Sequence, residues 1–101
     1  SYISGTGTID ANGKVGAIGG IKYKILATGR YGARYFLAPK ENCDSIVKMQ
    51  AQDPDLFNYY HAGQVRGTMV VVPVSTLDEA VKTVEAIKSG TPDDSLPRCG
   101  S

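Results

Sequence analysis

The stretch GTGTIDANGKVGAIGGIKYK, residues 5–24, decides how this chain folds. The Asn-Gly pair at positions 12 and 13 is a strong signal for the tight turn of a β-hairpin, because both residue types tolerate the left-handed backbone that such a turn requires. Polar and apolar residues alternate before the turn. We therefore predict a hairpin whose strands cover residues 2–10 and 14–18. The glycine pair that follows permits a sharp turn into a helix.

The helix expected over residues 21–30 carries a lysine on its inner side. At about 100° per residue, one face of this helix holds four neighbours: Ile21, Lys24, Ile25 and Thr28. Lys24 would then emerge among apolar residues, where an ammonium group is costly to desolvate and its pKa tends to fall, whereas Lys22 points away. A partly neutral lysine serves as a general base, so Lys24 is the candidate catalytic residue. The alternative is a lysine whose stem is buried while its amine reaches solvent.

Three motifs in this region carry a resemblance to a known family: TGTID from Thr6, GKV from Gly13 and IGGIKYK from Ile18. They resemble the second half of the Lon-type serine protease domain. In that family a Ser–Lys dyad cleaves peptide bonds, and its lysine closes a Gly-Gly-Leu/Ile-x-x-Lys pattern, which implies Lys24. The family also places a threonine near the lysine amine, which implies Thr6 as a supporting residue. The resemblance is close over residues 3–45 and persists as a pattern over residues 68–88.

The nucleophile that this resemblance implies is missing from the sequence. The family's serine stands in a Pro-Ser-Ala-Gly-like motif well upstream of the lysine, and the serines of this chain lie in no such motif. The chain therefore resembles the lysine-bearing half of a Ser–Lys endopeptidase, with the serine upstream of residue 1 or on a partner chain. The alternative is a non-catalytic Lon-like scaffold or assembly domain.

The resemblance also implies partners and a location. The partners are a polypeptide substrate and the segment or second chain that supplies the serine. Strands left without neighbours invite pairing with another copy, so self-association is a further expectation. The GTGTID form is closest to the PDZ-linked members of the family, which favours a membrane-anchored, extracytoplasmic protein, with a cytoplasmic one as the alternative.

Strands and helices alternate along the rest of the chain. Short strands are expected at residues 34–38 and 68–74, and a helix at residues 43–50 with three inward residues: Ile46, Val47 and Ala51. A capping box beginning at Thr76 starts the last helix. Its apolar stripe holds five residues: Leu77, Ala80, Val81, Val84 and Ile87. This order predicts an α/β fold in which an N-terminal hairpin precedes alternating helices and strands with some parallel pairing, the C-terminal part of a Lon protease-like domain.

Two segments fit this order less well. Residues 51–67 hold an aromatic cluster, LFNYYH, without a clear period. We expect it to pack as an extra helix on the sheet, with a lip over a substrate groove as the alternative. Residues 91–101 are polar and contain two prolines, so we expect a flexible tail after a domain that covers residues 1–90.

Composition excludes several functions. A net charge of +1 gives no reason to expect nucleic acid, and 42% hydrophobic residues suit one small globular domain. The glycines form no phosphate-binding motif, and His61 is a lone histidine, so neither a cofactor nor a metal is expected. No apolar run approaches the roughly 20 residues that span a bilayer. Two cysteines are too few for a disulfide framework, so Cys43 and Cys99 are expected to be free thiols.

Overall fold

A parallel three-stranded sheet, ordered β1-β4-β7, organises the chain in the computed structural model, which describes residues 2–100. Its strands are β1 (Tyr2–Gly5), β4 (Ala33–Pro39) and β7 (Val70–Val74), and the central strand β4 runs parallel to both neighbours. The predicted α/β class and its parallel pairing are therefore confirmed. All but one residue of β4 are buried, because the strand is covered on both faces.

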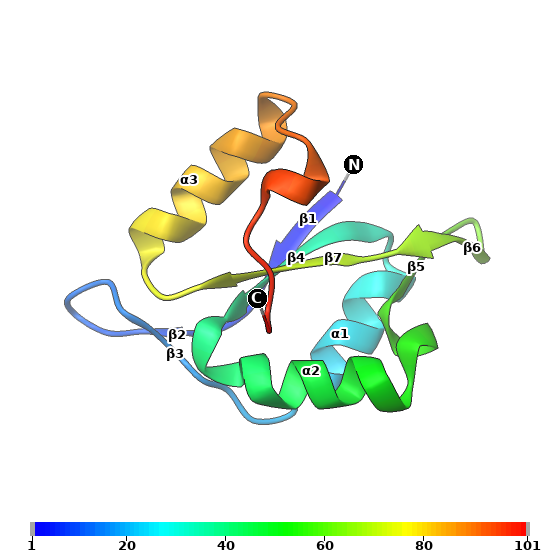
Figure 1. Cartoon of the computed structure of the whole chain (residues 1–101), viewed down its shortest axis with the longest axis horizontal. Helices are drawn as coiled ribbons and strands as arrows, with labels where there is room; N and C mark the ends of the chain where they lie inside the picture. Colours follow the sequence, from blue (N-terminus) through cyan, green and yellow to red (C-terminus); the bar gives the residue numbers. More distant parts are fainter. Residues whose placement is uncertain (1, 101) are drawn as a thin grey trace.

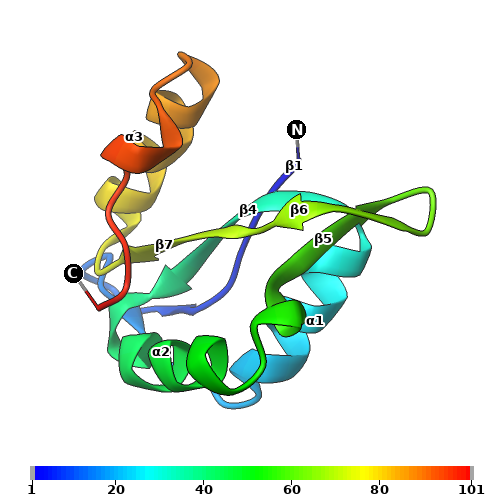
Figure 2. The same ribbon diagram turned by 45° about the vertical axis from the view of Figure 1, so that its right-hand side comes forward.

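Helices cover the two faces of this sheet unequally. Figures 1 and 2 show α1 (Ile21–Arg30) and α2 (Cys43–Gln52) on one face and α3 (Leu77–Lys88) on the other. Alternation along β4 sends Phe36 toward α1 and α2, where Ile25 and Ile46 meet it in the main core. Leu37 points to the opposite face, among residues that pack against α3.

The N-terminal hairpin forms, but its first strand is interrupted. Residues 2–5 pair with β4, whereas β2 (Thr8–Ile9) pairs antiparallel with β3 (Val15–Gly16). Between them Gly7 has φ of 147°, and a Cβ there would lie 2.8 Å from the Val15 side chain. The chain therefore leaves the sheet at a glycine and starts the hairpin afresh, so the single strand predicted over residues 2–10 was wrong.

The hairpin turn forms where the sequence predicts it, but of the Asn-Gly pair only Gly13 has positive φ, and the Gly13 N–H donates to the Asp10 carbonyl at 3.0 Å. Gly13 has φ of 79°, and the carboxylate of Asp10 accepts hydrogen bonds from the backbone N–H groups of Asn12 and Lys14, at 2.8 and 3.0 Å. These bonds, that from Lys14 first, hold the pKa of Asp10 below its ordinary value. Backbone bonds also tie the hairpin to the start of α3, since Leu77 donates to the carbonyl of Gly13 at 2.8 Å.

Residues 51–67 pack on the core, although not as the extra helix that we predicted. A 3₁₀ turn, η2 (Pro54–Phe57), is followed by a hairpin of β5 (Asn58–His61) and β6 (Gln64–Thr68). Leu56 and Phe57 are buried in the main core. The aromatic cluster is thus divided: its first residues supply core area, and the later tyrosines lie on a projecting hairpin.

The last helix begins as predicted but is only lightly covered. Thr76 Oγ1 accepts from the Glu79 N–H at 3.1 Å, and the Glu79 carboxylate accepts from the Thr76 N–H at 3.2 Å, which completes the capping box. No residue of α3 is fully buried, and Leu77 and Val81 are about half exposed, at 48% and 49%. Only part of the predicted apolar stripe therefore packs against the sheet, through residues such as Ala80 and Val84, and the rest is exposed.

The inner face of α2 also differs from the prediction. Ile46 is completely buried, whereas Val47 and Ala51 are exposed. The side of α2 that faces the core is formed instead by Cys43, Ile46 and Met49, which are spaced three residues apart. Ile46 is buried, and the other two are partly buried. Val47 lies about 100° from the centre of that side, which places it at the margin of the core.

The C-terminal segment is fastened to the domain, so the expectations of a loose tail and of free thiols were wrong. A disulfide joins Cys43, the first residue of α2, to Cys99, 56 residues later. Leu96 is buried between β7 and α3. The disulfide closes a covalent loop that contains β7 and α3, and Leu96 fastens the end of that loop to the core.

A polar network holds the same segment from its other end. Arg34 pairs with Asp93 at 2.9 Å, and the Tyr35 hydroxyl donates to the other Asp93 oxygen at 2.7 Å. The hydrogen bond from Tyr35, together with Arg34, holds the pKa of Asp93 below its ordinary value. The same bond raises the pKa of Tyr35.

Residues 2–100 contain neither a helix suited to a membrane nor a cluster suited to a metal ion. None of their helices has the length and apolar character that crossing a bilayer requires. Their histidine, cysteine and carboxylate side chains also form no cluster with the makings of a metal site.

Candidate active site

Lys24 lies on α1, and its side chain is exposed to solvent in the described structure. The buried face of α1 consists of Ile21, Ile25 and Gly29. Lys24 precedes Ile25 by one residue and is therefore rotated about 100° from it, at the edge of that face. Within residues 2–100 the predicted apolar surroundings of the lysine are absent, and its amine has no hydrogen-bond partner.

Two contacts show which edge of the helix carries Lys24. The Thr28 hydroxyl is 3.0 Å from the Ser4 hydroxyl of β1, so this side of α1 faces β1. Gly29 packs against the backbone of Asn58, so the other side faces β5. Thr28 is one helical turn beyond Lys24 and shares its side of the helix. The lysine therefore belongs to the side of α1 that faces β1.

Thr6 lies where β1 ends and shares a hollow with residues of α3, and no hydrogen bond joins it to Lys24 within residues 2–100. It follows the end of β1, and its N–H still donates to the carbonyl of Leu37 at 3.1 Å, which continues the strand by one residue. Because α1 runs antiparallel to β1, the step from Ser4 to Thr6, about 6.6 Å, matches the step from Thr28 back to Lys24, about 6 Å. Thr6 is thus two residues beyond the Ser4–Thr28 contact along the chain, and Lys24 is one helical turn before it on α1.

An apolar hollow of about 270 Å³ opens beside Thr6. It lies where the chain passes from β1 into the hairpin, under the first turn of α3. Its lining is glycine and aliphatic except for the threonine: Gly5, Thr6, Gly7, Ile9, Val15, Leu37, Val74, Leu77 and Ala80. The hollow has the size and character to receive an apolar side chain.

The outer edge of β1 has no neighbouring strand within residues 2–100. Lys24 lies on the side of α1 that is nearest this edge. A strand added beside β1 would therefore extend the sheet over the lysine side of α1. The unpaired edge of β1 within residues 2–100 is thus adjacent to Lys24, the candidate catalytic residue.

Asn42 is a further residue of this region, and sequence reasoning did not single it out. Its buried side chain accepts from the Ile18 N–H and donates to the Ile18 carbonyl, each at 3.1 Å. These bonds fasten the loop that leads through Gly20, with φ of 68°, into α1. The only sequence signal was an asparagine next to a helix start, which gives no hint of a contact 24 residues away.

The fold and this region define a layered α/β domain whose sheet is open at the edge beside a lysine-bearing helix. Comparison with known proteins gives the family: residues 1–86 match the model of the Lon protease (S16) C-terminal proteolytic domain. The Lon protease of Azospirillum brasilense is 38% identical over 77 residues, or 76% of this chain and 8% of that protein. The Lon protease of Chloroflexus aggregans is 36% identical, also over 77 residues, or 76% of this chain and 8% of that protein.

An archaeal relative extends the match. The archaeal Lon protease of Methanocaldococcus jannaschii is 32% identical over 79 residues, which are 78% of this chain and 10% of that protein. The chain belongs to the family of Lon protease C-terminal proteolytic domains. It spans about a tenth or less of the length of these relatives.

Proposed function

We propose that this chain is the lysine-bearing half of a Ser–Lys endopeptidase site, with Lys24 as general base and Thr6 as its supporting residue. One observation carries the proposal. The lysine that closes the IGGIKYK motif in this Lon family member lies on the β1 side of α1, next to the open edge of the sheet. That edge is where the segment bearing the serine, upstream or on a partner chain, would join the sheet.

The general-base role of Lys24 depends on a segment that covers this edge of the sheet. A segment packed over Lys24 would exclude water from the amine, and desolvation of an ammonium group favours its neutral form. The neutral amine accepts the serine proton as the serine oxygen attacks the peptide carbonyl, and it then returns that proton to the leaving amine. The Thr6 hydroxyl would orient the amine without adding charge. The apolar hollow beside Thr6 is available to a substrate side chain.

The test compares two lysines on the same helix in the complete protein that contains this chain. Lys24→Ala removes the general base, so we expect peptide hydrolysis to fall by roughly 10²–10⁴-fold or more. Lys22→Ala removes an equally exposed ammonium group and should leave most of the activity. Initial rates on a fluorogenic peptide measure both. An equal loss in the two variants, or a larger loss for Lys22→Ala, would contradict the assignment.

A non-catalytic scaffold is the second candidate. It is supported by the uncovered apolar side of α3, where Leu77 and Val81 are half exposed. A serine-directed covalent probe separates the two functions. Labelling of the complete protein that requires Lys24 supports the protease, and a folded protein that never labels supports the scaffold.

The expected partners and location belong to the same proposal. A polypeptide is the substrate, and the open edge of β1 is the place for a strand of another chain or another copy. The Cys43–Cys99 disulfide supports the extracytoplasmic location implied by the PDZ-linked resemblance, because disulfides persist in oxidising compartments and are rare in the cytosol.

A further inference from the structure

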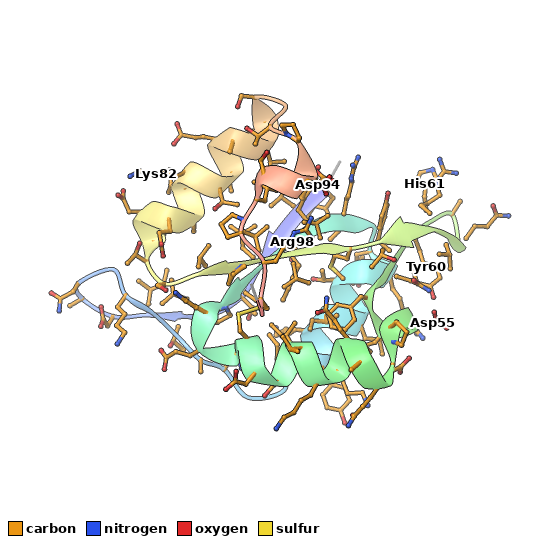
Figure 3. The ribbon with its side chains drawn as sticks, in the orientation of Figure 1. Asp55, Tyr60, His61, Lys82, Asp94 and Arg98 are labelled. Carbon is orange, nitrogen blue, oxygen red and sulfur yellow. A yellow bond between two sulfur atoms is a disulfide. The ribbon has the colours of Figure 1, made fainter. Side chains whose placement is uncertain are left out.

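A second, polar hollow lies near the C-terminal end of α1, beyond Lys24 along the helix. Its volume is about 620 Å³, and it opens to solvent between Tyr2 of β1, the loop after α1, the start of β4 and the β5–β6 hairpin. Figure 3 shows Tyr60 and His61 on that hairpin. Arginine and tyrosine dominate the lining: Tyr2, Arg30, Tyr31, Arg34, Tyr59, Tyr60, His61 and Arg66, with Gly32 and Ala62.

The charge of this hollow is positive and largely uncompensated. No carboxylate is among its lining residues. Arg34 is paired with Asp93, at 2.9 Å, but Arg30 and Arg66 are exposed and form no ion pair with any residue from 2 to 100. The carbonyl end of α1 contributes about half a negative charge, which two free guanidinium groups outweigh.

Tyrosine rings line the hollow on more than one side. Tyr59 and Tyr60 are partly buried, and a Cβ added at Gly67 would lie 3.2 Å from the Tyr59 ring. Tyr31, at 85% exposed, stands free on the opposite rim. Tyrosine and arginine are the residues enriched where proteins recognise one another, because both supply contact area and directed hydrogen bonds.

We propose that this hollow is a binding site for the carboxylate side chains of an acidic polypeptide segment. The planar fork of arginine matches a carboxylate with two parallel hydrogen bonds, and Arg30 and Arg66 supply two such forks. A polypeptide fits better than a nucleic acid, since the net charge of +1 provides no extended basic surface to follow a phosphate backbone. The site is independent of the assignment of Lys24, which lies about 9 Å earlier along α1.

The experiment measures binding of two fluorescein-labelled peptides, hexaglutamate and hexaglutamine, to the complete protein by fluorescence anisotropy. We expect hexaglutamate to bind at least tenfold tighter, because only its carboxylates engage the arginines. The double variant Arg30→Ala/Arg66→Ala should lose roughly tenfold or more of this affinity. Both side chains are exposed, so the variant keeps its core. Lys48→Ala, an exposed cation on α2, is the matched control and should bind hexaglutamate normally.

Three results would overturn the proposal. The first is equal binding of the two peptides. The second is an equal loss of affinity in the arginine variant and in Lys48→Ala, which would indicate nonspecific charge attraction. The third is tighter, arginine-dependent binding of tripolyphosphate or of a single-stranded oligonucleotide, which would reassign the hollow to phosphate.

Discussion

The amide of Asn42 illustrates how a single side chain can position a candidate catalytic residue that it never touches. It holds both polar groups of Ile18, and Ile18 begins the loop that leads into the helix of Lys24. Lys24 itself contributes little to the stability of the described fold, since it is exposed and unpartnered. The candidate catalytic residue and the residue that holds the loop before its helix are therefore subject to different physical demands.

We predict that Asn42→Ala destabilises the start of α1 by about 1–3 kcal/mol, because it leaves the N–H and carbonyl of Ile18 without partners. Hydrogen exchange of the α1 amides measures the effect in the complete protein, and exchange should accelerate. Gln50→Ala removes an exposed amide from α2 and serves as the control. Unchanged protection of α1 in Asn42→Ala would show that the loop holds its shape without this side chain.

At the scale of elements, the β5–β6 hairpin carries an unusual turn. Its two central residues are Ala62, with φ of 51°, and Gly63, with φ of 77°. A two-residue hairpin turn of type I′ has positive φ at both positions, which asparagine and glycine adopt more readily than alanine. The alanine concealed this turn in the sequence, and the hairpin it closes forms one wall of the arginine-rich hollow.

We predict that Ala62→Asn stabilises the hairpin by about 0.5–1 kcal/mol, because asparagine tolerates the left-handed backbone that alanine adopts at a cost. The thermal midpoint of the transition that includes this domain should rise. Ala62→Val is the opposing variant, since a β-branched residue is the least compatible with positive φ, and it should lower the midpoint. The reverse order of the two variants would contradict the turn geometry.

At the scale of the whole molecule, the C-terminal segment acts as a strap. It starts at the Arg34–Asp93–Tyr35 network, buries Leu96 and ends at the Cys43–Cys99 disulfide. A domain of about this size buries a modest share of its surface, so a covalent tie contributes a large part of its stability.

We predict that reducing the disulfide lowers the free energy of unfolding by about 2–5 kcal/mol, because it releases a loop of 56 residues in the unfolded chain. Urea unfolding of the complete protein with and without a phosphine reductant measures this change, read from the transition of this domain. Cys99→Ser should match the reduced protein and be insensitive to the reductant. A wild-type midpoint that does not respond to reduction would show that the bond contributes nothing to stability.

The sequence by itself determined the local elements and the family pattern. The Asn-Gly turn, the bounds of α1 and the capping box at Thr76 depend on contacts within four residues, so a short window contains their whole cause. Helical spacing predicted Lys24 on the inner face of α1, whereas its side chain is exposed in the described structure, because spacing alone cannot say how wide the covered face is. That width depends on which strands lie over the helix.

Only the tertiary structure decided the rest, because each remaining feature joins segments far apart in the chain. The Cys43–Cys99 bond, the reach of Asn42 to Ile18 and the register from Ser4 to Thr28 span between 24 and 56 residues. The arginine-rich hollow likewise draws on an N-terminal strand, a helix end and a hairpin. Such contacts depend on how the helices and the sheet pack together, and the sequence pattern within a short window does not determine that packing.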